Sequence, residues 1–143
     1  MAKPTNRISF NFKRPSRILK NKRLLKKYIA SIFDKESRIL ESLDFIFCDD
    51  EELLTINRQF LAHDYYTDVL TFDLSDSVGI VGEIYISLDR IKENSQNLRT
   101  PLQNELHRVI FHGILHLCGF KDKTAAEKQI MRRKEDKYLK DYL

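Results

Sequence analysis

The chain has 143 residues and a formal net charge of +4, with 42% hydrophobic and 32% charged residues. This length favours a single domain, 1–143, and with only four glycines and three prolines the composition excludes a disordered or collagen-like chain. No apolar run approaches the ~20 residues of a bilayer span, and Met1–Phe12 lacks the apolar stretch of a signal peptide, so we expect a cytoplasmic protein without membrane association.

The first predicted elements lie in a strongly basic segment. Alternating apolar residues predict a strand over 8–12, and helical spacing predicts an amphipathic helix over 17–33. Ten Lys and Arg residues precede the first acidic residue. Such a patch attracts phosphate backbones without selecting a sequence, although a solvated helix face explains it equally well. The candidates for nucleic-acid binding here are Arg14, Arg17, Lys20, Arg23 and Lys27.

The remaining elements alternate between strands and helices. A strand is predicted over 43–48, and Asp49 with Glu52 forms a capping box for a helix through residue 60. Strands over 68–73 and 81–87 and helices over 88–98, 101–119 and 124–142 follow. The expected fold class is α/β of the α+β type, with a small mixed sheet of about four strands surrounded by helices. Cys48 and Cys118 are expected to be buried, reduced thiols.

Two histidines on the predicted helix 101–119 have the spacing of a metal site. His112 and His116 are four residues apart, so their imidazoles project from one face on successive turns. Gly119 can end the helix in a left-handed conformation, which lets Asp122 offer a third ligand. This spacing matches the metzincin pattern with aspartate as third ligand, and three protein ligands leave one position open for water. Two hydrogen-bonded histidines without a metal are the alternative.

Other groups near this face suggest proton transfer and phosphate binding, and one absence argues against proteolysis. Glu105 lies within about 20° of His112 on a helical wheel, so it could orient a ligand histidine or handle a proton. Arg108, one turn before His112, could bind a phosphate, while an ion pair on the helix surface is the alternative for both residues. Metalloproteases carry a glutamate directly after the first histidine, and this chain has Gly113 there.

Three motifs in order resemble the YbeY family of bacterial ribosomal RNA maturation factors. The string HGILHLCGF is similar to the family signature HGxLHLxGY, TDVLTF (67–72) is similar to its TDVLSF, and GEIYIS (82–87) is similar to its GDIxIS strand. The similarity covers the chain from about residue 8 to residue 142. The resemblance implies a metal-dependent endoribonuclease, specific for single strands.

Two positions depart from the family pattern. The family ends its signature with a third histidine, and Asp122 stands at that position. Leu61 aligns with a family arginine associated with activity, and Arg58, one turn away, is a candidate replacement. Asp68 is expected to bond backbone at the start of its strand, and Tyr28, Tyr65 and Tyr66 are expected either to stack on unpaired bases or simply to pack.

The leading expectation is a monomeric endoribonuclease of 16S ribosomal RNA 3′-end maturation and ribosome quality control. His112, His116 and Asp122 would hold one Zn²⁺ or another divalent metal, and the partners would be single-stranded ribosomal RNA and proteins of the small subunit. Two alternatives stay open. One is a non-catalytic ribosome-assembly or RNA-binding factor with a structural metal, and the other is a zinc metallopeptidase.

Overall fold

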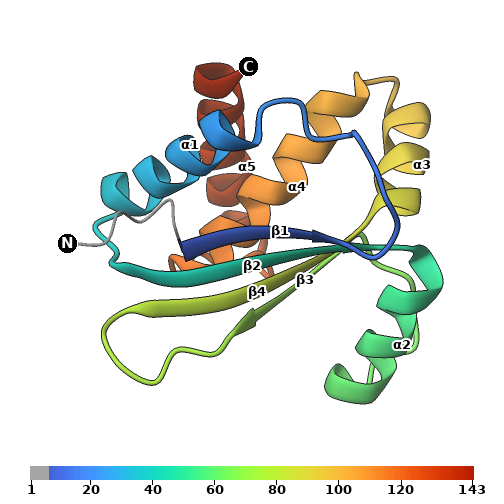
Figure 1. Cartoon of the computed structure of the whole chain (residues 1–143), viewed down its shortest axis with the longest axis horizontal. Helices are drawn as coiled ribbons and strands as arrows, with labels where there is room; N and C mark the ends of the chain where they lie inside the picture. The colour runs from blue at the N-terminus through green and yellow to red at the C-terminus, as the bar shows by residue number, and fades with distance from the viewer. Residues whose placement is uncertain (1–6) are drawn as a thin grey trace.

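A computed structural model describes residues 7–143, in which four strands and five helices follow one another (Figure 1). The preceding residues, including Lys3 of the basic segment, lie outside the described part. The elements in chain order are β1 (Ile8–Phe12), α1 (Lys22–Lys35), β2 (Leu40–Cys48), α2 (Asp50–Leu61), β3 (Val69–Asp73), β4 (Ile80–Ser87), α3 (Leu88–Leu98), α4 (Leu102–Leu117) and α5 (Ala125–Tyr142). The predicted α+β class is confirmed.

The sheet is mixed and has the strand order β1-β2-β4-β3. β1 is parallel to β2 and β2 is parallel to β4, whereas β3 is antiparallel to β4 at the edge. In that last pair Val69 lies opposite Ile86 and Asp73 lies opposite Gly82. The C-terminal ends of the three parallel strands β1, β2 and β4 therefore lie at the same end of the sheet, where α2 and α3 begin.

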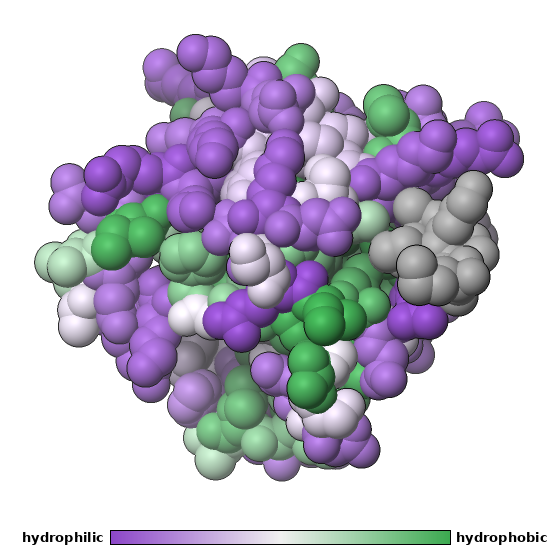
Figure 2. Space-filling model, turned by 90° about the vertical axis from the view of Figure 1, so that its left-hand side faces the viewer, coloured by the Kyte–Doolittle hydropathy of each residue, from purple (hydrophilic) through white to green (hydrophobic). Residues whose placement is uncertain are grey.

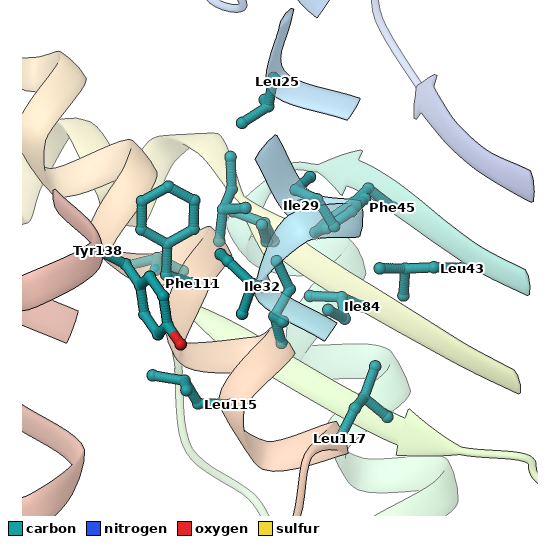
Figure 3. Close-up of a cluster of buried hydrophobic side chains, with 14 of the residues drawn as sticks. Leu25, Ile29, Ile32, Leu43, Phe45, Ile84, Phe111, Leu115, Leu117 and Tyr138 are labelled. Atoms are coloured by element: carbon teal, nitrogen blue, oxygen red, sulfur yellow. The ribbon is translucent and has the colours of Figure 1, made fainter. Parts of the chain in front are cut away.

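Most helices lie on one face of the sheet. α1 and α4 cover this face and α5 packs against α4 (Figure 1). Figure 3 shows the resulting core, in which side chains of α1, α4 and α5 meet those of β2 and β4. The labelled core residues are Leu25, Ile29, Ile32, Leu43, Phe45, Ile84, Phe111, Leu115, Leu117 and Tyr138. α2 contributes Leu53 to a second, smaller cluster with Cys48 and Leu70. α4 is thus enclosed between the sheet and α5, which explains its largely apolar sequence.

Local sequence signals account for several helix boundaries. Asp49 and Glu52 form the predicted capping box of α2, and Thr124 and Glu127 form another at α5. The side chain of Ser87 caps α3 by accepting from the N–H of Arg90. Each cap satisfies N–H groups that a helix start otherwise leaves without partners.

The start of α1 differs from its prediction. The helix begins at Lys22, after Asn21 caps it by accepting from the N–H of Leu24, and not at residue 17. Ile18 and Leu19 are buried in a segment without regular secondary structure, and the amide of Gln103 donates to the carbonyl of Ile18 at 2.9 Å. This anchoring to α4 keeps residues 17–20 out of the helix.

The surface is largely polar on the face shown in Figure 2. Hydrophobic side chains there lie in small groups among hydrophilic ones. Within residues 7–143, no helix combines the length and the apolarity needed to cross a bilayer. Both cysteines are buried and free, as predicted, and burial raises the pKa of each thiol to about 12.

Candidate metal centre

α4 and the turn after it bring three ligand-type side chains together. His112 and His116 lie on successive turns with ring centroids 4.5 Å apart. The chain then leaves the helix at Gly119, whose φ of +103° lies in the left-handed region. There the N–H of Phe120 donates to the carbonyl of Leu115 at 3.0 Å, which closes the helix end. The predicted glycine turn is confirmed, and it returns Asp122 to the histidines.

The three ligand atoms form a nearly equilateral triangle. Nε2 of His112 lies 3.0 Å from Nε2 of His116, and Oδ2 of Asp122 lies 3.2 and 3.3 Å from these nitrogens. Bonds of about 2.0–2.1 Å to a tetrahedral zinc ion place ligand atoms about 3.3 Å apart. The triangle therefore has the size of one face of such a tetrahedron, and these residues form a group that could hold a metal ion.

Each imidazole is oriented through its other nitrogen. Nδ1 of His112 lies 2.6 Å from Oε2 of Glu135, and Nδ1 of His116 lies 2.9 Å from the carbonyl oxygen of Phe120. These acceptors hold a proton on both Nδ1 atoms, which leaves the Nε2 lone pairs for a cation. Burial alone would lower the pKa of His112, but the hydrogen bond and charge of Glu135 outweigh it and raise that pKa.

The carboxylate that orients His112 is thus Glu135 and not Glu105, which corrects the expectation for an orienting role of Glu105. Glu105 is buried, with 6% of its surface exposed. Burial, reinforced by the charge of Asp68, raises the pKa of this carboxyl. Its predicted role in proton transfer stays a prediction.

Arg108 forms ion pairs between α4 and α5. Its guanidinium lies 3.0 Å from Oε1 of Glu135 and 2.7 Å from Oδ1 of Asp136. Burial opposes the charge, yet the two carboxylates raise the pKa of Arg108 above its usual value. Phosphate binding by Arg108 stays a prediction, and a phosphate would have to compete with these partners.

A cavity of about 390 Å³ opens beside His112. Its walls come from the start of β3, from α3, α4 and α5, and from Asp122, and they include Asp68, Asn94, Glu105, Arg108, His112, Asp122, Arg132 and Glu135. Asp68 is half-buried in this wall, and the amide of Asn94 donates to its Oδ2 at 3.4 Å. Burial raises the pKa of this carboxyl, and a structural role for Asp68 at the start of its strand stays a prediction. The mixture of acidic and basic walls suits a charged, hydrogen-bonding ligand.

The candidates for RNA binding lie elsewhere on the surface. Arg14, Arg17 and Lys20 are exposed in the segment before α1, and Arg23 and Lys27 are exposed on α1. Arg14 pairs with Asp49 at 3.3 Å. None of these residues lines the cavity beside His112.

Arg58, the candidate replacement for the family arginine, is also exposed. It lies on α2 and pairs with Asp64. Leu61 lies on the same helix and is 39% exposed. Like the basic segment, Arg58 does not line the cavity beside His112.

The expected stacking tyrosines differ in exposure. Tyr28 is packed, with its hydroxyl donating to the carbonyl of Tyr138 at 3.0 Å and its ring against Tyr142. Tyr65 and Tyr66 are 55% and 46% exposed. Packing therefore accounts for Tyr28, and base stacking by the other two stays a prediction.

Glu135 and Arg132 are residues of the site that the sequence patterns did not indicate. Glu135 is separated from His112 by 23 residues, so no local spacing joins them. One signal was present: Met131, Glu135, Tyr138 and Tyr142 lie on one face of α5, which places an acidic residue on an apolar stripe. A charge at such a position requires a buried partner.

Comparison with known proteins gives one consistent result. A family model described as Endoribonuclease YbeY matches residues 9–143. The chain is 49% identical to the Endoribonuclease YbeY of Cytophaga hutchinsonii over 122 residues, 85% of each chain, and 46% identical to that of Bacteroides fragilis over 113 residues, 79% of each. The solution structure of TM1509 from Thermotoga maritima matches with a TM-score of 0.66 at 30% identity, covering 94% of this chain and 88% of that one.

Proposed function

This chain belongs to the YbeY family of endoribonucleases, and on that premise we propose that it cleaves single-stranded RNA at a metal centre formed by His112, His116 and Asp122. The observation that carries the proposal is the triangle of two Nε2 atoms and one carboxylate oxygen, with sides of 3.0 to 3.3 Å. The Nδ1 atoms are engaged elsewhere, so the ligand atoms face one another and have no other described partner.

The proposed metal is one Zn²⁺ per chain, with another divalent cation as the alternative. Imidazole nitrogen and carboxylate oxygen both bind zinc, and three protein ligands leave the fourth position open, as in catalytic sites. Such an ion supplies Lewis acidity and lowers the pKa of a bound water. Asp122 adds a negative charge that the third histidine of the family pattern does not carry.

The chain's own residues bind and orient the substrate in this proposal. Glu105, buried in the wall of the cavity with a raised carboxyl pKa, would act as general acid and donate its proton to the oxygen that leaves the phosphorus when the phosphodiester bond breaks. Arg108 lines the same cavity, and the basic residues Arg14, Arg17, Lys20, Arg23 and Lys27, together with Arg58, hold the RNA backbone by charge.

Peptidase activity is a poor fit because of the position after His112. A Cβ atom added to Gly113 would lie 2.9 Å from Cδ1 of Ile84 and 3.2 Å from Oγ1 of Thr71. A side chain here would therefore meet the sheet and not the cavity. The general base of a metallopeptidase has no room at this position.

A non-catalytic factor that binds RNA and uses the metal only for structure is the second candidate, and Leu61 in place of the family arginine favours it. Replacing His116 with Ala separates the two. We expect the H116A variant to lose metal and to cleave single-stranded RNA at least about 100-fold more slowly than the wild type, because it lacks a metal ligand. His63→Ala, an exposed histidine whose imidazole lies by Tyr65, is the matched control and should retain full cleavage. Equal cleavage by H116A and wild type, or no cleavage by the zinc-loaded wild type, would overturn the nuclease proposal.

The same proposal covers the biological setting. The substrate is ribosomal RNA, at the 3′ end of 16S RNA and during ribosome quality control, and the partners include small-subunit proteins. The protein acts as a monomer. A ribosomal substrate places its activity in the cytoplasm.

A further inference from the structure

We propose that Glu135 is a positioning residue of the metal centre and that Arg108 holds Glu135 in place. Glu135 lies on α5, whereas both histidine ligands lie on α4. The inference rests on the proposed function, because it assigns residues that prepare His112 to bind the metal. It gives Arg108 a structural task at the site in place of direct contact with phosphate.

The first step is the unequal support of the two histidines. Nδ1 of His116 bonds the carbonyl oxygen of Phe120, which lies four residues later in the turn after α4. The turn that ends the helix therefore orients this ring. His112 has no such local partner. Its Nδ1 instead contacts a carboxylate at 2.6 Å from another helix, and the side chain of that residue, Glu135, is only 6% exposed.

The second step is the division of the Glu135 carboxylate between two partners. Oε2 faces His112 and Oε1 faces the guanidinium of Arg108 at 3.0 Å. The other end of the guanidinium is held by Asp136 at 2.7 Å. With each oxygen engaged by a different partner, the carboxylate cannot rotate without breaking a contact, so the ring of His112 has one orientation.

The third step concerns charge. A carboxylate that accepts from Nδ1–H makes Nε2 a stronger ligand, and such outer partners are worth about 10- to 100-fold in metal affinity. The guanidinium of Arg108, 3.0 Å from Oε1, offsets the charge of the Glu135 carboxylate in its enclosed position. The guanidinium of Arg108 pairs with two carboxylates at 3.0 and 2.7 Å. Arg132 on the cavity wall is 63% exposed and contacts Asp136 at the longer distance of 3.8 Å, so Arg132 is the more accessible of the two cations for a phosphate.

The test measures metal binding without RNA. Glu135→Gln keeps the size of the side chain but places an amide where Arg108 or His112 needs an acceptor. We expect Co²⁺ and Zn²⁺ to bind about 10- to 100-fold more weakly in competition titrations, with displaced visible absorption bands of bound Co²⁺. Arg108→Lys should cause a smaller change of the same kind, because a lysine cannot bridge both carboxylates as a guanidinium does.

Glu36→Gln is the matched control. Glu36 is another enclosed carboxylate at the surface of α5, where it contacts Lys134 at 2.9 Å and the hydroxyl of Tyr138, away from His112. Its replacement should lower the melting temperature while the metal affinity and the Co²⁺ bands stay as in the wild type. The comparison separates the docking of α5 from the positioning of His112.

Three results would decide against the inference. Unchanged Co²⁺ bands and affinity in Glu135→Gln would remove the positioning role, while the metal centre would stand. Equal losses of affinity in Glu36→Gln and Glu135→Gln would reduce the effect to the docking of α5. A wild-type chain that takes up neither Co²⁺ nor Zn²⁺ would overturn the proposed metal centre itself.

Discussion

The interface of α4 and α5 and the basic segment before and along α1 use charge in opposite ways. At the interface, Glu135 is enclosed and each of its oxygens has a partner within 3.0 Å. Along the basic segment, Arg17, Lys20 and Arg23 are exposed to solvent, and the fold does not depend on contacts of their charged groups. An enclosed charge holds its partners in a fixed geometry, so replacing one such residue has a large effect on the site. Exposed charges contribute jointly to binding, and salt screens their attraction for a ligand.

The largest effect should come from the ligand that departs from the family pattern. We expect Asp122→Ala to weaken zinc binding by more than about 100-fold, beyond the usual effect of an outer partner, and to abolish RNA cleavage. Asp122→His should retain the metal, because imidazole is also a zinc ligand. Competition with a chelator measures the metal affinity of both variants. Unchanged affinity in Asp122→Ala would remove this residue from the metal site.

The next effect should come from the buried carboxyl beside the cavity. Glu105→Gln removes a proton-transfer group and keeps its shape, so we expect kcat on single-stranded RNA to fall by about 100-fold. Metal affinity should not change, since no described contact joins Glu105 to the ligands. Single-turnover cleavage together with a metal titration checks both parts. A kcat equal to that of the wild type would assign Glu105 to packing alone.

Neutralising the basic segment should have a moderate and salt-dependent effect. Replacing Arg17, Lys20 and Arg23 together with Gln should lower the slope of log affinity for RNA against log salt by about 2, at about 0.7 for each contact with a single strand. Binding is measured from low to high salt with a catalytically inactive background. An unchanged slope would place the RNA on another surface, and metal binding serves as the control.

A smaller effect, on stability, should follow from a methyl group at Gly113. The added Cβ would lie 2.9 Å from Ile84, so helix and sheet must separate slightly. Overpacking of this kind costs about 1–3 kcal/mol. Urea unfolding of Gly113→Ala should report this loss. An equally stable variant would show that α4 can shift away from β4.

The smallest effect should come from a third histidine of α4. His107 is buried against Tyr142 and Phe111, and burial lowers its pKa. The unfolded chain takes up a proton near pH 6.5. The folded chain does so only at lower pH. The stability that the neutral His107 contributes is therefore complete above about pH 6.5, the pKa of the unfolded chain, and is lost as the pH falls from there through the lower pKa of the folded chain. The free energy of unfolding, measured from pH 7.5 to 5, should fall less in His107→Gln than in the wild type. Identical pH profiles would contradict this.

The parts of the fold that depend on local contacts were predictable from the sequence. The capping box of α2 involves residues three apart, and the ligand pair of α4 involves residues four apart. Pattern reasoning detects such spacings. Gly119 and Asp122 followed because a glycine that ends a helix fixes where the next residues can lie.

The parts that depend on distant contacts were not predictable. The late start of α1 results from the burial of Ile18 and its bond to Gln103, 85 residues away. Glu135 was missed because its relation to His112 exists only after α5 has packed on α4. Its place on the apolar stripe of α5 indicates that Glu135 has a buried partner, but the pattern does not identify that partner.

The position of Glu135 on α5 also orders events in time. A chain is made from its N-terminus, so a nascent chain that has completed α4 holds His112 and His116 before Glu135 exists. His116 gains its backbone partner once the chain has turned at Gly119 and reached Phe120, while His112 gains its partner only from α5. The two ligands therefore depend on different parts of the fold, because His116 is oriented by the end of its own helix and His112 only by the packing of α5.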